Sequence, residues 1–364
     1  MKASDFSDAF IGNILIMDIS VLSETCIESV GNICLFSLRN TNGTTVKLTN
    51  WGASLVSIDT VDNKGSFSNI LLGYSDVVDY MQDSYYMGAV IGPFANRICG
   101  GKFSIDGKSY FLDCNDGANT NHSGSACIGR KCWEWEILDH GLCFSILSPH
   151  LDGGFLSPHL DGGFPGNLLL KVIYSLTEND ELVIDYYATT DEKTYVNLTN
   201  HAYFNLGNPK EKISTHWLQI NSSKILETDA TFIPTGQCVS VDGTPFDFSF
   251  SHPIGDFMFD VNNQQIRWNR GYNHYYILNC MDTPRSLIHA ASLFYPSNGK
   301  RVDVFTDYPG MLLYTSGYYC IPDTGVCFET QYFPDTPSHA HFPSCLLNPG
   351  DIYRHKTIFK FSIN

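Results

Sequence analysis

Short runs in which apolar and polar residues alternate recur along the whole chain. Residues 103–113 and 133–139 alternate closely, while residues 168–176 and 181–189 are rich in β-branched and aromatic side chains. Alternation with a period of two places successive side chains on opposite faces of a strand. These runs therefore predict β-strands, most of them with at least one face buried in a core.

Turn-forming residues separate the runs. Asp106-Gly107 lies between two alternating segments, and further clusters of turn residues occur at 62–65 and 178–180. An Asp-Gly pair favours the two-residue turn of a β-hairpin, because both residues tolerate a positive φ. The pattern thus predicts that strands adjacent in the sequence pair antiparallel.

Helical periodicity is weak throughout the sequence. One short helix is predicted at residues 76–82, and no long amphipathic segment alternates with the strands, which disfavours a Rossmann or barrel α/β fold. We therefore expect an all-β fold, a single large antiparallel β-sandwich over residues 23–364. Residues 1–22 are predicted to form an N-terminal extension.

The composition is consistent with a large buried core. The chain has 364 residues, of which 43% are hydrophobic and 16% are charged, and its net charge is −16. This acidic balance argues against nucleic acid and against an anionic membrane surface as partners, because both attract clustered Lys and Arg. No apolar run approaches the ~20 residues that a membrane helix needs, so no membrane association is expected.

The twelve cysteines do not resemble a zinc site or a disulfide framework. They form no Cys-x-x-Cys pair, and several lie in apolar runs, as Cys34 and Cys143 do. We expect buried free thiols in a reducing compartment. The N-terminus lacks the charged region and the cleavage site of a secretory signal, so the predicted location is the cytoplasm.

One eight-residue segment, SPHLDGGF, occurs at 148–155 and again at 157–164. Its His and Asp residues admit a metal site, but Gly-rich acidic repeats are more typical of solvated loops. Added loop residues also change the entropy of loop closure only slightly. We interpret the repeat as a lengthened hairpin loop and expect one copy to be dispensable.

Several polar residues interrupt the apolar, strand-rich segments: Asn96 and Arg97 in ANRI, His122 in TNHSG, His201 in NLTNHAYFNL and Glu329 in FETQYFPDTP. An isolated buried charge is costly, so each has either a structural partner or a functional role. In the structural interpretation, the two histidines are hydrogen-bonded core imidazoles and Glu329 pairs with Arg97. The sequence shows no phosphate-binding loop, nucleophile elbow or zinc-binding helix, and we expect neither a metal nor a nucleotide cofactor.

Taken together and in order, these segments resemble the aldose 1-epimerase family, also called galactose mutarotases. The resemblance covers roughly residues 30–362. Its motifs are NWGASLVSIDTVDNKG, LLGY, GPFANRICGGKFSIDGKSYFL, NLTNHAYFNLG, DATFIPTGQ, GTPFDF, YPGMLLYTS, FETQYFPDTPSHAHFP and LNPGDIYRHKTIFKF. The resemblance implies a large antiparallel β-sandwich of the galactose mutarotase type, with a sugar bound in an open groove.

The resemblance also implies a cofactor-free reaction, the interconversion of the α and β anomers of a hexose such as galactose or glucose. By the family match Glu329 is the catalytic base and His201 the catalytic acid. Asn96, Arg97 and His122 are implied to hold sugar hydroxyls, together with Asn273. The expected partner is a small-molecule sugar, and the expected assembly is a monomer or a homodimer.

The chain departs from the family pattern at several positions, among them Gly92-Pro93 in place of Gly-Arg and Ser123 in place of the first Gly of His-Gly-Gly. Two further departures concern the contacts to sugar hydroxyls. Asn273 stands where the family has an acidic residue, and Leu312 stands where the family often has Gln. Asn273 accepts a weaker hydrogen bond than a carboxylate does, unless it is only a turn residue after Gly271. The departures leave alternatives open: an isomerase for another cyclic hemiacetal or for a hexose-6-phosphate, or a non-catalytic carbohydrate-binding sandwich.

Overall fold

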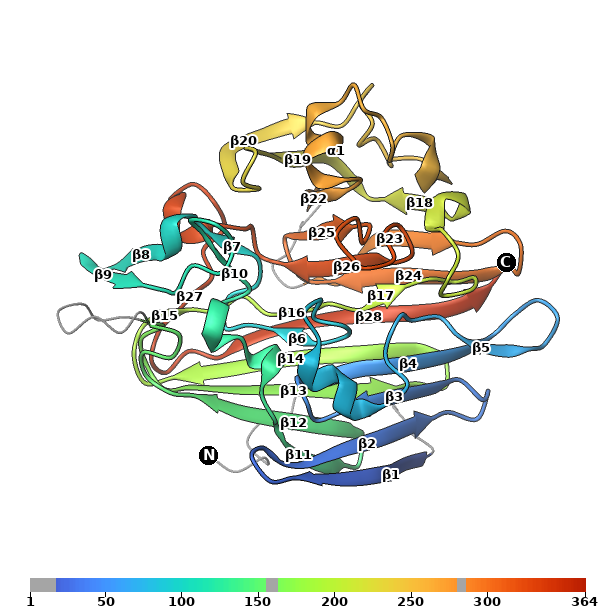
Figure 1. The fold of residues 1–364 in the computed structure, drawn as a ribbon, viewed down its shortest axis with the longest axis horizontal. Coiled ribbons are helices and arrows are strands. Elements are labelled where there is room, and N and C mark those ends of the chain that lie inside the picture. Colours follow the sequence, from blue (N-terminus) through green and yellow to red (C-terminus); the bar gives the residue numbers. More distant parts are fainter. Residues whose placement is uncertain (1–17, 155–162, 280–285) are drawn as a thin grey trace.

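The computed structural model describes residues 18–154, 163–279 and 286–364. Its long strands form three sheets, of nine, six and five strands (Figure 1). Neighbouring strands in these sheets pair antiparallel. The predicted all-β sandwich is therefore confirmed.

The nine-stranded sheet has the order β11-β12-β13-β14-β28-β24-β23-β18-β21. Its strands are β11 (Glu134–Leu138), β12 (Gly141–Ser148), β13 (Leu168–Leu176), β14 (Glu181–Thr190), β28 (Tyr353–Ile363), β24 (Lys300–Thr306), β23 (Ile288–Phe294), β18 (Trp217–Ile220) and β21 (His252–Pro253). The C-terminal strand β28 lies between β14 and β24, so this sheet joins the middle of the chain to its end.

The six-stranded sheet has the order β17-β26-β25-β22-β19-β20. Its strands are β17 (Tyr203–Phe204), β26 (Val326–Gln331), β25 (Gly310–Tyr314), β22 (Asn273–Leu278), β19 (Ser222–Thr228) and β20 (Pro234–Ser240). The five-stranded sheet follows the chain order and contains β1 (Asp18–Ile27), β2 (Gly31–Arg39), β3 (Thr45–Thr49), β4 (Ser54–Val61) and β5 (Phe67–Asn69).

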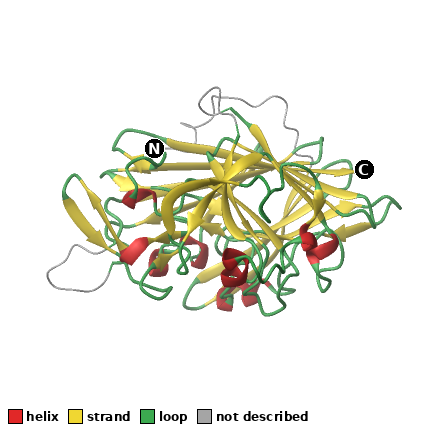
Figure 2. Cartoon of the chain, turned by 90° about the horizontal axis from the view of Figure 1, so that it is seen from above, coloured by secondary structure: helices red, strands yellow, loops and turns green. Residues whose placement is uncertain are grey.

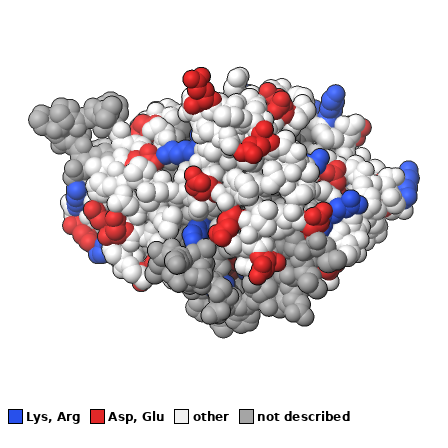
Figure 3. Space-filling view, turned by 90° about the horizontal axis from the view of Figure 1, so that it is seen from below, with Lys and Arg blue, Asp and Glu red and all other residues white. Residues whose placement is uncertain are grey.

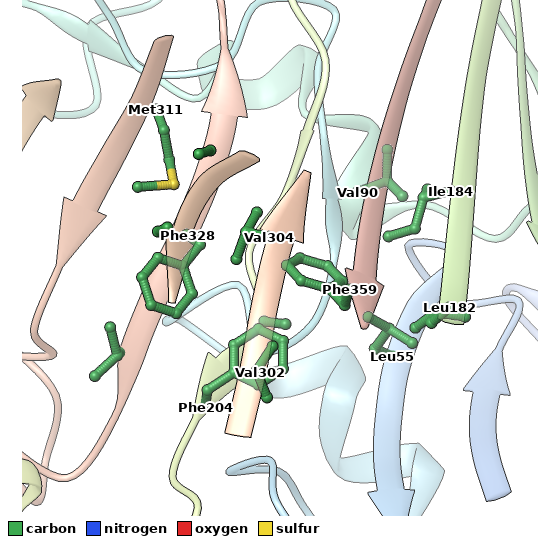
Figure 4. Packing of buried hydrophobic residues seen from close by; sticks show 14 of the residues in the cluster. Leu55, Val90, Leu182, Ile184, Phe204, Val302, Val304, Met311, Phe328 and Phe359 are labelled. Carbon is green, nitrogen blue, oxygen red and sulfur yellow. The ribbon is translucent and has the colours of Figure 1, made fainter. Parts of the chain in front are cut away.

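The core lies where these sheets face one another (Figure 4). Alternate residues of β24 and β28 are buried, which is the period of two that the sequence predicts. Phe359 of β28 contacts Phe204 of β17, with ring centroids 4.9 Å apart, and Phe204 in turn lies 6.0 Å from Phe328 of β26. These aromatic contacts hold β26 firmly against the nine-stranded sheet.

The predicted hairpin at Asp106-Gly107 is present. It joins β8 (Lys102–Ile105) to β9 (Lys108–Phe111), and both turn residues have positive φ, 51° and 84°. Such a pair matches the twist of the flanking strands. The turns at 62–65 and 178–180 likewise join paired strands, β4 to β5 and β13 to β14.

Helices are few and short, and most of them lie with the loops on one side of the sheets (Figure 2). The helix predicted at 76–82 is a 3₁₀ helix, Val77–Gln82. The short helix α1 (Gln264–Asn269) was not predicted. Asn263 caps its N-terminus, with a side-chain oxygen that accepts from the N–H groups of Gln265 and Ile266. Among the described residues, no helix is long and apolar enough to span a membrane.

Strand β1 begins at Asp18, so the expected domain boundary at residue 22 falls inside this strand. The repeat forms the connection between the paired strands β12 and β13, as expected, and its residues 155–162 lie outside the described part. Of the described ends of the repeat, Pro149 and His150 are exposed, as expected for a solvated loop, whereas Phe164 is buried against Phe103.

The expectation that the cysteines are buried is only partly correct. Of the eleven that the structure describes, five are buried, five are exposed and one is intermediate, and all eleven are free thiols. The exposed thiols include Cys114 and Cys320 in loops and Cys99 in a short 3₁₀ helix, where the apolar runs that suggested burial do not extend. Acidic side chains are scattered over the face shown in Figure 3, with a few Lys and Arg between them.

Candidate active site

One cavity of about 310 Å³ brings together all six residues that the sequence singled out. They come from segments that lie far apart in the chain, from Asn96 to Glu329. The complete lining is Ser84, Tyr85, Tyr86, Asn96, Arg97, Asp116, Asn121, His122, His201, Tyr203, Phe232, Asn273, Leu312, Tyr314, Tyr318 and Glu329.

Glu329 and His201 are held by regular backbone pairing. Glu329 lies on β26, whose residues are all buried, and is paired in register with Leu312 of β25. His201 lies between the two-residue strands β16 (Thr199–Asn200) and β17. Its backbone N–H donates to the carbonyl of Ala89 (2.9 Å), and its carbonyl accepts from the N–H of Gly88 (3.0 Å). Both side chains are therefore anchored by rigid elements.

The two side chains face each other inside the protein. Nε2 of His201 lies 3.5 Å from Oε1 of Glu329, and the carboxyl group is 1% exposed. The other carboxyl oxygen, Oε2, has no hydrogen-bond partner among the described residues. An unpartnered buried carboxyl oxygen is costly in a purely structural pair. The arrangement therefore leaves the hydrogen-bonding capacity of Oε2 unused, beside a cavity that Glu329 lines.

Burial shifts both groups toward their neutral forms. Desolvation raises the pKa of Glu329 to about 8, an effect that the positive charge of Arg97 partly opposes. Desolvation also lowers the pKa of His201 to about 4. Over the range between these values the pair holds one proton, which the two groups can exchange. Such a pair can both accept and donate a proton near neutral pH.

Asn96 and His122 form one wall of the cavity, and the backbone of both residues is strained. Both have positive φ (68° and 51°), and the backbone N–H of Asn96 donates to Nδ1 of His122 (3.2 Å). This bond leaves the proton of a neutral His122 on Nε2, because a neutral imidazole carries only one N–H. Burial and the neighbouring positive charges lower the pKa of His122 well below its usual value, so the ring is neutral.

Arg97 does not pair with Glu329, so this part of the structural interpretation is wrong. Its Nε donates to Asp116 (2.7 Å), and its guanidinium lies 4.8 Å from the ring centroid of Phe232. Asp116 orients the guanidinium, whose remaining N–H groups can donate to ligand oxygens. Sequence reasoning missed Asp116 because it lies in a loop without a recognisable spacing to Arg97.

Aromatic rings surround the polar groups. Tyr203 lines the cavity and packs 4.9 Å from the ring of His201, and Tyr86 lies 4.9 Å from His122. Trp51, by contrast, is partly buried and packs beside the cluster that contains Leu72. The rings offer apolar faces of the kind on which the C–H groups of a sugar pack.

The departures from the family pattern at Asn273 and Leu312 lie on neighbouring strands of the cavity wall. Asn273 is the first residue of β22 and is paired in register with Tyr314 of β25, while Leu312 lies on β25 beside Glu329. The interpretation of Asn273 as a turn residue is therefore wrong. Together the two side chains make this wall less polar than the wall formed by Asn96, Arg97 and His122.

The cavity also contains the group of side chains best placed to hold a metal ion within the described part of the chain. Ligand atoms of His122, His201 and Glu329 lie within 4.8 Å of one another. Two imidazoles and a carboxylate can bind a transition metal. The repeat, where the sequence admitted a metal site, contributes no such group from its described residues.

Comparison with known proteins agrees with this geometry. A family model described as aldose 1-epimerase matches residues 35–360. A galactose mutarotase from Bos taurus is 35% identical over 330 residues, which cover 87% of this chain and 91% of the relative. An aldose 1-epimerase from Escherichia coli K12 is 31% identical over 343 residues, which cover 90% of this chain and 94% of the relative.

Two solved structures share the fold at a TM-score of 0.81 each. One is the GalM/aldose epimerase homologue from C. elegans, with 27% identity and coverage of 90% of this chain and 98% of the other. The second is galactose 1-epimerase from Lactobacillus acidophilus, with 26% identity and coverage of 95% and 99%. The likeness therefore extends over nearly the whole of each chain.

Proposed function

The chain belongs to the aldose 1-epimerase family, and we propose that it interconverts the α and β anomers of a hexose such as galactose or glucose, with Glu329 and His201 as its acid/base pair. The observation that carries the assignment of these two residues is their position. They face each other across 3.5 Å at one cavity, and one carboxyl oxygen of Glu329 has no hydrogen-bond partner among the described residues.

The proposed reaction begins when the sugar enters and the shared proton moves from Glu329 to Nε2 of His201. This transfer changes no net charge, and the 3.5 Å contact between Glu329 and His201 is expected to rearrange around the bound sugar. The pair then consists of a carboxylate and an imidazolium. Asn96, Arg97, His122 and Asn273 are proposed to hold the sugar hydroxyls.

Ring opening follows from these two groups. Glu329 accepts the proton of the C1 hydroxyl, the O–H electron pair forms the C1 carbonyl, and the bond from C1 to the ring oxygen breaks. His201 delivers its Nε2 proton to that oxygen. Rotation about C1–C2 then presents the other carbonyl face, and the same transfers run in reverse to close the ring.

The test is polarimetry of freshly dissolved α-D-galactose and α-D-glucose, with and without protein, in the presence of EDTA. We expect faster equilibration with the protein, unaffected by the chelator, and background rates with Glu329→Gln and His201→Asn. Equilibration at the buffer rate for both sugars would overturn the proposed activity. Loss of activity in EDTA, restored by an added metal ion, would overturn the metal-free mechanism.

Leu312 supports a second candidate substrate. An ordinary hexose would place a hydroxyl group against the apolar side chain of Leu312 and lose a hydrogen bond there. A deoxy-hexose that lacks this hydroxyl would lose none. The same polarimetric assay on deoxy-hexoses, with Leu312→Gln as the matched variant, separates the two. A preference for the deoxy sugar that Leu312→Gln reverses would identify the second candidate.

The remaining proposals concern the surroundings of the protein. A reducing compartment, the cytoplasm, is supported by the free thiols of the described cysteines. We also propose a monomer or a homodimer, which sedimentation of the purified protein can distinguish.

A further inference from the structure

The imidazole of His201 has a side chain of β26 at each of its two nitrogens. Nε2 faces Oε1 of Glu329 at 3.5 Å, and Nδ1 lies 3.6 Å from Sγ of Cys327. Cys327 and Glu329 are two residues apart on one strand, so their side chains point to the same face. One strand therefore presents a carboxyl group and a thiol to the same ring.

The other neighbours of the imidazole are aromatic rings. Tyr203, Tyr86, Tyr314 and His122 surround it at centroid distances of 4.9 to 6.1 Å. Among the described side chains, the hydrogen-bond partner of Nδ1 is Cys327, and a hydrogen bond between the ring and the backbone of His201 itself favours the protonated ring. A proton on Nδ1 therefore has the sulfur of Cys327 as its side-chain acceptor.

We propose that Cys327 is a positioning residue whose sulfur accepts a hydrogen bond from the Nδ1–H of His201 and thereby keeps Nε2 as the nitrogen that exchanges protons. This inference rests on the proposed acid/base role of His201. If Nδ1 keeps its proton throughout the cycle, Nε2 receives the proton of Glu329, passes it to the ring oxygen and takes it back at closure. The opposite tautomer, with the proton fixed on Nε2, cannot accept a proton from Glu329.

Sulfur suits this position because it is a weak acceptor. A carboxylate there would stabilise the imidazolium and raise the pKa of His201. Burial and the charge of Glu329 keep the thiol of Cys327 protonated, by raising its pKa well above the usual value. A neutral sulfur can thus orient the ring and still leave the imidazolium a strong acid.

The decisive measurement is ¹⁵N NMR of protein labelled at histidine, since it shows which ring nitrogen carries the proton. The signal of His201 is assigned by its loss in His201→Asn. In the wild type we expect Nδ1 protonated and Nε2 unprotonated at neutral pH. In Cys327→Ala we expect a mixture of the two tautomers. A wild-type His201 protonated on Nε2 would overturn the proposal.

Kinetics provide the second readout. Cys327→Ala should lower kcat about five- to tenfold with little change in KM, the effect of losing one modest hydrogen bond needed in the transition state. Cys327→Ser, whose hydroxyl can also accept, should recover part of the loss. The matched control is Cys345→Ala, which truncates a buried cysteine in a different cluster and should change neither kcat nor the tautomer.

The outcomes separate this inference from the proposed function. If the wild type does not accelerate mutarotation, the proposed function fails, and the NMR result still decides the hydrogen bond. If Cys327→Ala leaves both the tautomer and kcat unchanged, the positioning role is wrong. If Cys327→Ala does not fold, the wild-type tautomer and the Cys327→Ser variant provide the same decision.

Discussion

At the scale of single residues, the burial of Glu329 has a consequence for stability as well as for chemistry. Its folded-state pKa is raised to about 8, above the ordinary value of 4.5 that applies when the chain is unfolded. The unfolded chain therefore releases this proton first as the pH rises. Between these two values the carboxyl group increasingly destabilises the folded state.

Glu329→Gln should therefore abolish turnover and also stabilise the protein. Gln keeps the shape of Glu but cannot accept the proton, and at pH 7 the variant is spared the penalty of a buried acid, about 3 kcal/mol. Urea unfolding at pH 7 and at pH 4.5 measures the gain, which should shrink at the lower pH. A variant that is less stable than the wild type at pH 7, or one that retains turnover, contradicts this expectation.

The pair also predicts the dependence of the rate on pH. Turnover needs one proton shared between Glu329 and His201, so kcat/KM should be bell-shaped. The acidic limb should lie near pH 4, where His201 takes up a second proton, and the basic limb near pH 8, where Glu329 loses the last one. Initial rates from pH 3.5 to 9 test this. A single limb near pH 6.5 would mean that an unperturbed histidine controls the rate.

Asn273 predicts a change in sugar binding. Its side chain lines the cavity, and a hydrogen bond to a charged partner contributes ~1.5–3 kcal/mol against ~0.5–1.5 for a neutral one. Asn273→Asp should therefore lower KM for galactose or glucose, by up to roughly tenfold. Steady-state kinetics on both sugars measure it. Lower activity instead would show that the cavity is shaped for a sugar other than an ordinary aldohexose.

The residues of the site could be predicted only in part. Glu329, His201, Asn96, Arg97 and His122 stand out because they are polar groups inside apolar segments, and the resemblance supplied their proposed roles. Other members of the lining, such as Asp116 and Phe232, could not be found in this way. They lie in loops, and they meet Arg97 only through the folding of segments far apart in the chain.

At the scale of elements, the repeat is the clearest case for an experiment. Its described ends already form a hairpin. The N–H of Phe164 donates to the carbonyl of Asp152 (3.1 Å), and the N–H of Leu151 donates to the carbonyl of Phe164 (2.7 Å). Gly153 directly follows Asp152, and Gly163 directly precedes Phe164. Both glycines have positive φ, 75° and 88°. A two-residue Gly-Gly turn between paired strands requires such angles.

Deleting one copy should therefore leave the protein intact. Removal of residues 148–156 gives the same polypeptide as removal of 154–162, because the segment is repeated, and it joins the two glycines directly. We expect the free energy of unfolding to change by less than ~1 kcal/mol and the kinetics to be unchanged. Phe164→Ala is the matched disruption and should cost about 3 kcal/mol, because that ring is buried. A comparable loss on deletion would show that the second copy is structurally required.

Elements were predictable where local chemistry decides them. The hairpin at Asp106-Gly107 needs only a turn that fits the strand twist. Helix α1 was missed because six residues are too few to establish a helical period. The two-residue strands β16 and β17, which hold His201, have no alternation to read and exist because β26 and β6 (Val90–Ile91) pair with them.

At the scale of the whole molecule, the sandwich buries several titratable groups to build the site and its support. Among the residues that the structure describes, four histidines are buried with a lowered pKa, mainly because the fold removes water from them: His122, His201, His216 and His274. Long-range strand pairing causes this burial, so the sequence alone did not show it for His216 and His274.

These four imidazoles predict sensitivity to acid. In the unfolded chain each takes up a proton near pH 6.5, whereas the folded chain resists protonation to pH 4 or below for His201, His216 and His274. The unfolded state thus binds more protons as the pH falls, and each imidazole removes about 1.4 kcal/mol of stability per pH unit below 6.5. Glu329 acts in the opposite direction over this range but is only one group. Urea unfolding should therefore show a marked loss of stability from pH 7 to pH 5.

His274→Asn offers a matched control, since its amide oxygen can replace Nδ1 as the acceptor for the N–H of Asn273. The variant should lower by about one the number of protons taken up on unfolding near pH 5. Equal pH dependence in both proteins would mean that His274 is protonated in the folded state, and that its cavity admits water or an anion.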